Sequence, residues 1–289
     1  MNNSVLVARP EFVRAVESGA YGVVEKPLTP WEKLCNNGAL RKTLLLLLLA
    51  AIWEIYATTL NNTLLLPRFS DTLAALLENI RNGVLPQRSW FSVKVLVQGY
   101  AAGMILAALL SALAITSRIG NDFLETLTAM LNPLPAIALL PLALIWFGLG
   151  NGSLIFVLIH SVLWPVALNT HSGFMSVSQT MRMVGRNYGL TGPRYVAMIL
   201  IPAAFPNILT GMKIGWAFAW RTLIAAELVF GVSSGSGGLG WFIYENKTQL
   251  EIANVFAGLF SVTLIGLFIE NVIFRNIDAR TVRRWGMQS

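Results

Sequence analysis

The stretch TLLLLLLAAIWEIYATTL, residues 43–60, decides the class of fold. It contains six consecutive leucines, and Glu54 is its single charged residue. A bilayer core of about 30 Å needs roughly 20 apolar residues in a helix, so this run predicts a first membrane span. Trp53 and Tyr56 are typical of the aromatic belt at a membrane–water interface.

The rest of the chain has the same character. Of its 289 residues, 55% are hydrophobic and only 12% are charged, whereas soluble domains carry about 25% charged residues. We therefore predict an all-α polytopic membrane protein with about six transmembrane helices. Further apolar runs predict the other spans at 93–115, 123–147, 154–169, 203–230 and 254–274. Prolines in the third span predict kinks there.

Polar segments divide the chain. We predict an N-terminal tail at 1–42, a transmembrane domain at 43–275 and a basic C-terminal tail at 276–289. The loops expected beside the spans include a short one at 117–125, a long one at 171–200 and a glycine-rich turn at 231–240, and residues 72–80 predict a surface helix.

Basic residues indicate the orientation. Both tails and the loops at 117–125 and 171–200 carry fourteen basic residues, and the opposite side carries five. Because positive charge accumulates on the cytoplasmic side, both termini are expected in the cytoplasm of a multi-pass protein of the cell inner membrane.

Several functions have no support in the sequence. One cysteine, Cys35, and two histidines predict neither a disulfide nor a metal site. The sequence has no Gly-x-x-x-x-Gly-Lys-Ser/Thr loop, so ATP and magnesium are expected on another subunit. The basic residues are dispersed, which argues against nucleic acid. No catalytic cluster is apparent, and we predict a protein that is not an enzyme and binds no cofactor.

The segment Met183-Val-Gly-Arg-Asn-Tyr-Gly189, followed after nine residues by Ile199-Leu-Ile-Pro202, is informative. It resembles the cytoplasmic Glu-Ala-Ala loop of permease subunits in binding-protein-dependent ABC importers. Gly189, Ile199 and Pro202 match the pattern of that family. The three positions of Glu-Ala-Ala hold Met183, Val184 and Gly185 instead, and Ile201 replaces a leucine.

The resemblance implies a coupling helix within about 176–200 that docks on the ATPase. Gly189 and Gly192 predict a break between two short helices, and Pro193 suits the first turn of the second. Arg182 and Arg186 lie four residues apart, hence on one helix face, and could meet acidic groups of the ATPase. The alternative is a simple turn whose arginines only orient the protein.

Two further blocks extend the resemblance, Pro133–Gly150 and Pro202–Leu228. Both are similar to the subfamily that imports nitrate, bicarbonate, alkanesulfonate and taurine. The resemblance implies the type I ABC importer permease fold and transport of a small solute by alternating access. The implied partners are a cytoplasmic ATPase dimer, an extracytoplasmic substrate-binding protein and a second copy of the chain.

Charged residues inside apolar spans are expected to face a cavity, a partner charge or the interface. Arg221, Glu227 and Trp220 are candidates for the translocation pathway, with Arg221 suited to a small oxyanion. The alternatives are an ion pair between Arg221 and an acidic residue of another helix, a structural or gating role for Glu227, and helix packing by Trp220.

Two other functions fit a polytopic protein. An ion-coupled secondary transporter would show broken helices at matching places in two halves, and the prolines lack that symmetry. A membrane-embedded enzyme would show clustered catalytic groups. The sequence leaves nitrate, sulfonate, taurine and bicarbonate open as substrates.

Overall fold

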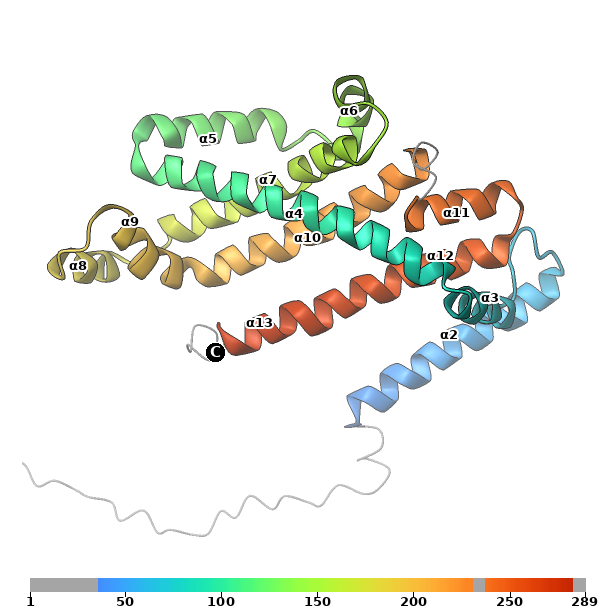
Figure 1. Ribbon diagram of the computed structural model, residues 1–289. Helices are drawn as coiled ribbons and strands as arrows, with labels where there is room; N and C mark the ends of the chain where they lie inside the picture. The colour runs from blue at the N-terminus through green and yellow to red at the C-terminus, as the bar shows by residue number, and fades with distance from the viewer. Residues whose placement is uncertain (1–35, 231–236, 283–289) are drawn as a thin grey trace, which may run out of the picture. The chain divides into compact units, whose positions relative to one another are not determined.

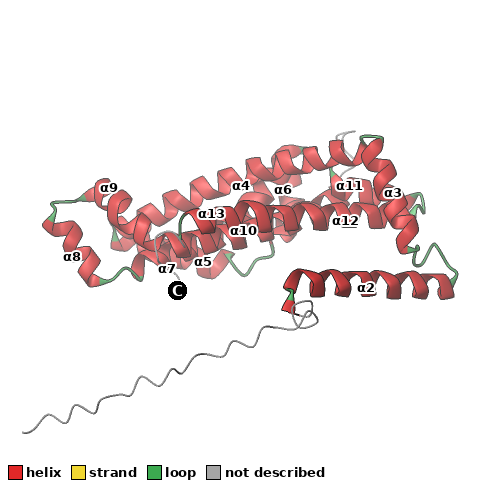
Figure 2. Cartoon of the chain, turned by 90° about the horizontal axis from the view of Figure 1, so that it is seen from below, coloured by secondary structure: helices red, strands yellow, loops and turns green. Residues whose placement is uncertain are grey.

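The computed structural model describes residues 36–230 and 237–282. The predicted tails therefore lie largely outside the described residues, as does most of the predicted glycine-rich turn. Every element of the described residues is helical (Figures 1 and 2). The chain divides into two units, 1–51 and 52–289, so α2 (Gly38–Leu60) begins in the first and ends in the second. The arrangement below concerns 52–289.

Five helical stretches are long and apolar enough to cross a membrane, and a bent pair of helices makes up to six. This confirms the prediction of about six spans. The elements after α2 are α3 (Phe69–Arg81), α4 (Val84–Thr116), α5 (Arg118–Leu131), η1 (Ala136–Leu139), α6 (Leu140–Phe147), α7 (Asn151–Met175), α8 (Gln179–Asn187), α9 (Gly192–Tyr195), η2 (Val196–Leu200), α10 (Ile201–Phe230), α11 (Leu239–Thr248), α12 (Ile252–Phe268), η4 (Ile269–Phe274) and α13 (Arg275–Arg280).

The third predicted span is broken. The helices at 118–131 and 136–147 meet at 86°, which is far more than a kink. Pro133 and Pro135 lie in the break, and neither can donate a backbone hydrogen bond. The expected loop at 117–125 is also mostly helix, because the Ser117 hydroxyl accepts from the Gly120 N–H at 2.9 Å and caps α5.

Close packing of α4, α7 and α10 forms the centre of the bundle. A Cβ at Gly99 would lie 2.5 Å from the Leu158 Cβ, and one at Gly103 would lie 2.7 Å from the Val162 Cβ. These two glycines, four residues apart, let the α4 and α7 backbones approach closely. The many Ala and Gly residues of α4 thus serve close helix packing.

The second half of α2 is hydrogen-bonded to α3 and to the segment that precedes it. The Trp53 Nε1–H donates to the Pro67 carbonyl at 2.9 Å. The Glu54 carboxylate accepts from the Ser70 backbone N–H at 3.0 Å and from its hydroxyl at 2.9 Å. Glu54 therefore caps α3, where a negative charge near a helix N-terminus is stabilising.

Candidate functional site: a surface hairpin and a buried outer clasp

A helical hairpin, α8–turn–α9, lies at the end of the bundle where α4 meets α5 (Figure 1). The Ser178 hydroxyl accepts from the Met181 N–H at 3.4 Å at the start of α8. Gly189 and Gly192 have φ of 69° and 55°, a backbone region that glycine adopts without steric cost. Pro193 lies in the first turn of α9. The break between two short helices thus falls at the two glycines named from the sequence.

The two ends of the motif meet inside this hairpin. Gly185 is buried, and a Cβ there would lie 2.8 Å from Tyr195 Cε2 and 3.0 Å from Ile199 Cγ1. The Leu190 N–H also donates to the Gly185 carbonyl at 3.0 Å. The third position of the motif therefore holds glycine because Tyr195 occupies the space that a side chain would need.

The two arginines of α8 have different environments. Arg182 donates from Nη2 to the Phe174 carbonyl at 2.7 Å and from Nε to the Val177 carbonyl at 3.1 Å. It therefore stabilises the C-terminus of α7, where a positive charge is favourable. Arg186 is exposed. Arg182 would have to give up these two hydrogen bonds to contact another protein, whereas Arg186 would not.

Large apolar side chains are exposed on α8 among polar ones. We call Met181, Met183, Val184 and Tyr188 the α8 patch; all four are exposed, Tyr188 by 81%. Such a patch in an otherwise polar segment is typical of an interaction surface. The sequence reasoning included Met183 and Val184 but missed Met181 and Tyr188. The signal that could have identified them is the presence of large apolar residues in a polar loop.

A second polar cluster lies at the opposite end of the bundle. Glu227 on α10 is only 2% exposed. The Ser92 Oγ of α4 lies 2.8 Å from both carboxylate oxygens, and the Gly240 N–H donates to Oε2 at 2.9 Å. Ser92 Oγ in turn accepts from the Leu239 N–H at 2.9 Å. We call this cluster the outer clasp, because it joins α4 and α10 to the start of α11.

Arg88 strengthens the same junction. Its Nη1 donates to the Gly237 carbonyl at 2.8 Å, and its Nη2 lies 3.3 Å from the Glu245 carboxylate. Glu227 is thus placed in a structural junction. Ser92 and Arg88 were missed by the sequence reasoning, and no local pattern marks them, since their partners lie more than a hundred residues away in the chain.

The other two pathway candidates lie in the second half of α10. Trp220 is buried, and its Nε1–H donates to the Val262 carbonyl on α12 at 3.3 Å, which is a packing contact between helices. Arg221 is exposed. Neither ion pair found between described residues includes Arg221; the α10 cation that does pair is Lys213, 4.0 Å from Asp278.

Long apolar helices, one broken span and a surface hairpin define a polytopic membrane protein of the transporter class. The sequence profile of the family "Binding-protein-dependent transport system inner membrane component" matches residues 99–283. The chain belongs to this family.

Curated relatives agree with this assignment. The chain is 31% identical to a putative ABC transporter permease protein of Methanocaldococcus jannaschii over 227 residues, 77% of this chain and 84% of the relative. It is 29% identical to the taurine transport system permease protein TauC of Escherichia coli over 233 residues, 77% and 82% of the two chains. It is 32% identical to the nitrate import permease protein NrtB of Synechocystis over 175 residues, 61% and 62%. The chain is therefore a multi-pass ABC importer permease subunit of the inner membrane.

Proposed function

We propose that two copies of this chain form a pathway through which a small oxyanion enters the cell. A cytoplasmic ATPase dimer binds ATP and magnesium and hydrolyses the nucleotide. An extracytoplasmic binding protein delivers the solute to the other end. In this assignment the chain itself catalyses no reaction and binds no cofactor, metal or nucleic acid; it converts the movement of the ATPase into alternating access.

The observation that carries this proposal is the α8 patch beside Arg186. A hairpin with exposed Met, Val and Tyr side chains and the exposed guanidinium of Arg186 suits a groove on a second protein. Its buried contacts, Gly185 against Tyr195 and Ile199, make it a rigid unit that continues into α10 through η2. A force on the hairpin would therefore act on a membrane span.

The placement of this hairpin supports the orientation that we propose. The hairpin and the α4–α5 turn with Arg118 lie at the same end of the bundle, while α3 and α11 lie at the other (Figure 1). An ATPase requires the hairpin end to be cytoplasmic. We accordingly place both termini in the cytoplasm, as the distribution of basic residues predicts.

The oxyanion class is supported by the named relatives and by Arg221. Nitrate and taurine both carry oxygen atoms with negative charge, and the relatives NrtB and TauC are named for them. Arg221 lies on a membrane span and belongs to neither ion pair found between described residues, and a charge within a span is costly unless it serves a pathway or a partner.

The test is co-expression of the chain with its genomic neighbours for an ATPase and a binding protein. Tyr188→Asp and Val184→Asp are expected to abolish ATPase co-purification and uptake, because each places a charge in the α8 patch. Gln179→Asp is the matched control, since an acidic residue at the exposed start of α8 is favourable. Intact ATPase binding and uptake in both patch variants would contradict the proposal.

A further inference from the structure

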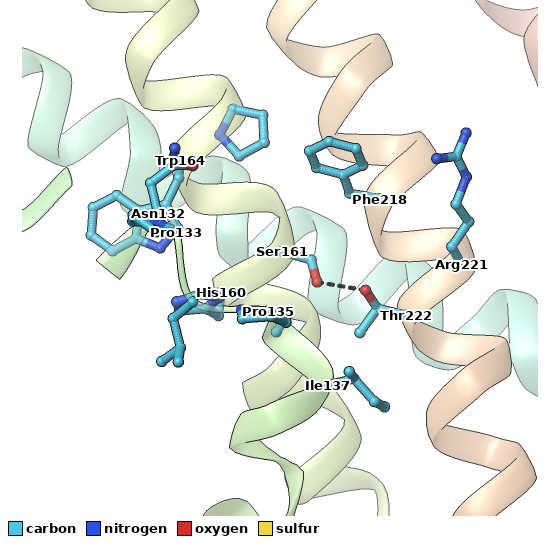
Figure 3. A pocket seen from close by; sticks show the side chains of 13 residues that line it. Asn132, Pro133, Pro135, Ile137, His160, Ser161, Trp164, Phe218, Arg221 and Thr222 are labelled. Atoms are coloured by element: carbon cyan, nitrogen blue, oxygen red, sulfur yellow. Dashed lines mark hydrogen bonds between the residues drawn. The ribbon is translucent and has the colours of Figure 1, made fainter. Parts of the chain in front are cut away.

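The side chain of Arg221 leaves α10 on the side away from α7. Figure 3 shows its guanidinium directed away from Ser161 and Trp164. On that side it lines a pocket of about 230 Å³, which lies between α10 and the helix that runs from α12 through η4. Glu270 of η4 lines the same pocket. Both side chains are exposed, and both belong to segments long and apolar enough to cross a membrane.

An ion pair lower down the same two helices gives their register. The Lys213 ammonium of α10 lies 4.0 Å from the Asp278 carboxylate of α13. The two helices run in opposite directions (Figure 1). Arg221 follows Lys213 by eight residues, and Glu270 precedes Asp278 by eight residues. At a helical rise of 1.5 Å per residue, Arg221 and Glu270 therefore lie at matching heights, about 12 Å from the first ion pair.

An aromatic contact between these heights supports the register. Trp216 of α10 packs edge-on against Phe274 of η4, with ring centroids 6.2 Å apart. Trp216 follows Lys213 by three residues and Phe274 precedes Asp278 by four, as antiparallel helices require. The rings separate the two helices by a gap that only long side chains can bridge. Arginine and glutamate are such side chains.

The charges that line the pocket leave Arg221 one partner. Glu270 is the only acidic residue among the described residues that line it, and Lys213, the other cation there, already contacts Asp278. A charge within a span is costly unless it is paired, and opposite charges attract more strongly beside apolar walls than in water.

We propose that Glu270 is the counter-ion of Arg221 within the membrane, and that their side chains meet across this pocket as a second ion pair between α10 and the last span. Neither residue belongs to an ion pair of the described residues, so the contact forms by rotation of two exposed side chains. Two ion pairs about 12 Å apart would hold the helix that continues from the hairpin against the last span. A carboxylate occupies two of the five donors of a guanidinium, so the pair is compatible with the proposed function.

The experiment measures thermal unfolding of the purified full chain in lipid nanodiscs, without ATPase, binding protein or solute. Arg221→Met and Glu270→Met are each expected to lower the unfolding midpoint by about 5 °C, because each leaves a charge without its counter-ion. The variant with both changes should lose less than either single variant, since replacing both members of an ion pair by apolar residues is often nearly neutral.

A matched control tests the choice of partner. Lys213→Met combined with Glu270→Met removes the other cation of the pocket, and its losses are expected to add. The inference is overturned if the losses of Arg221→Met and Glu270→Met also add, or if Glu270→Met is compensated by Lys213→Met instead.

An exchange of the charges keeps the test decisive if the single variants do not fold. Glu270→Arg alone places two cations at one height and should accumulate poorly in the membrane. Glu270→Arg with Arg221→Glu restores opposite charges and should accumulate as the unaltered chain does; failure to recover would overturn the inference. Because no transport is measured, this outcome is separate from the outcome of the proposed function.

Discussion

The outer clasp offers the sharpest quantitative test of the packing. Glu227→Ala would leave the Ser92 hydroxyl and the Gly240 N–H without their acceptor in a buried place. Each unsatisfied buried group costs about 1–3 kcal/mol, and the side-chain cavity adds to this. We expect Glu227→Ala to lower the free energy of unfolding by about 3–5 kcal/mol.

Ser92→Ala removes one partner of the carboxylate and leaves the Leu239 N–H without an acceptor. We expect a loss of about 2–3 kcal/mol. The double variant should lose less than the two single losses together, because the bond between Ser92 and Glu227 is broken in both. Comparing the double variant with the two single variants is a double-mutant cycle, and it gives the coupling free energy of the pair. In such cycles side-chain hydrogen bonds of membrane proteins average about 0.6 kcal/mol, and bonds to charged groups reach about 1.5–3 kcal/mol. A coupling of about 1–2 kcal/mol is expected.

The assay is reversible unfolding of the purified protein in mixed micelles, followed by tryptophan fluorescence. Ser111→Ala provides the control, since Ser111 is equally buried on α4 but lies about 28 Å from Ser92 at a helical rise of 1.5 Å per residue. Combined with Glu227→Ala it should be additive within about 0.5 kcal/mol. A coupling between Ser92 and Glu227 no larger than this control would refute the reasoning.

Three further outcomes follow from contacts elsewhere. Gly103→Val should lower the free energy of unfolding by about 1–3 kcal/mol, because its Cβ would meet Val162, and Ala101→Val on the exposed side of α4 should not. Trp53→Phe should cost about 1 kcal/mol in the same assay through loss of its bond to the α2–α3 turn. Gly185→Leu should reduce uptake and ATPase co-purification far more than Gly185→Ala, since the alanine Cβ, 2.8 Å from Tyr195 Cε2, requires only a small shift of that ring, whereas leucine must displace it; equal activity of the two variants would show that this packing is not needed for coupling.

Hydropathy predicted the spans because membrane insertion depends on local composition. The break between two short helices at Gly189 and Gly192 was equally predictable, because a backbone turn with positive φ favours glycine. The angle of 86° between the two helices that follow one another at the break after α5 could not be predicted. The two prolines leave backbone carbonyls without donors, but packing against neighbouring helices decides the angle.

The polar contacts of the site could be predicted least. Ser92 and Glu227 are 135 residues apart in the chain, and nothing in either local segment indicates the other. Arg182 illustrates the same limit. Its spacing from Arg186 predicted a shared helix face correctly, but its hydrogen bonds to the end of α7 depend on how the chain turns at Val177. Which of two similar arginines remains free is therefore a tertiary property.

The arrangement of α10 explains how events at the two membrane surfaces can be linked. One end of this helix continues from the hairpin through η2, where a wider π-type turn interrupts regular α-helix. Arg221 lies in its second half, and Glu227 near its other end accepts a hydrogen bond from the start of α11. Because 30 helical residues span about 45 Å, a displacement of the hairpin would reach Arg221 and the outer clasp through one continuous helix. The η2 turn lies where the hairpin joins this helix, and π-type turns occur frequently at functional sites.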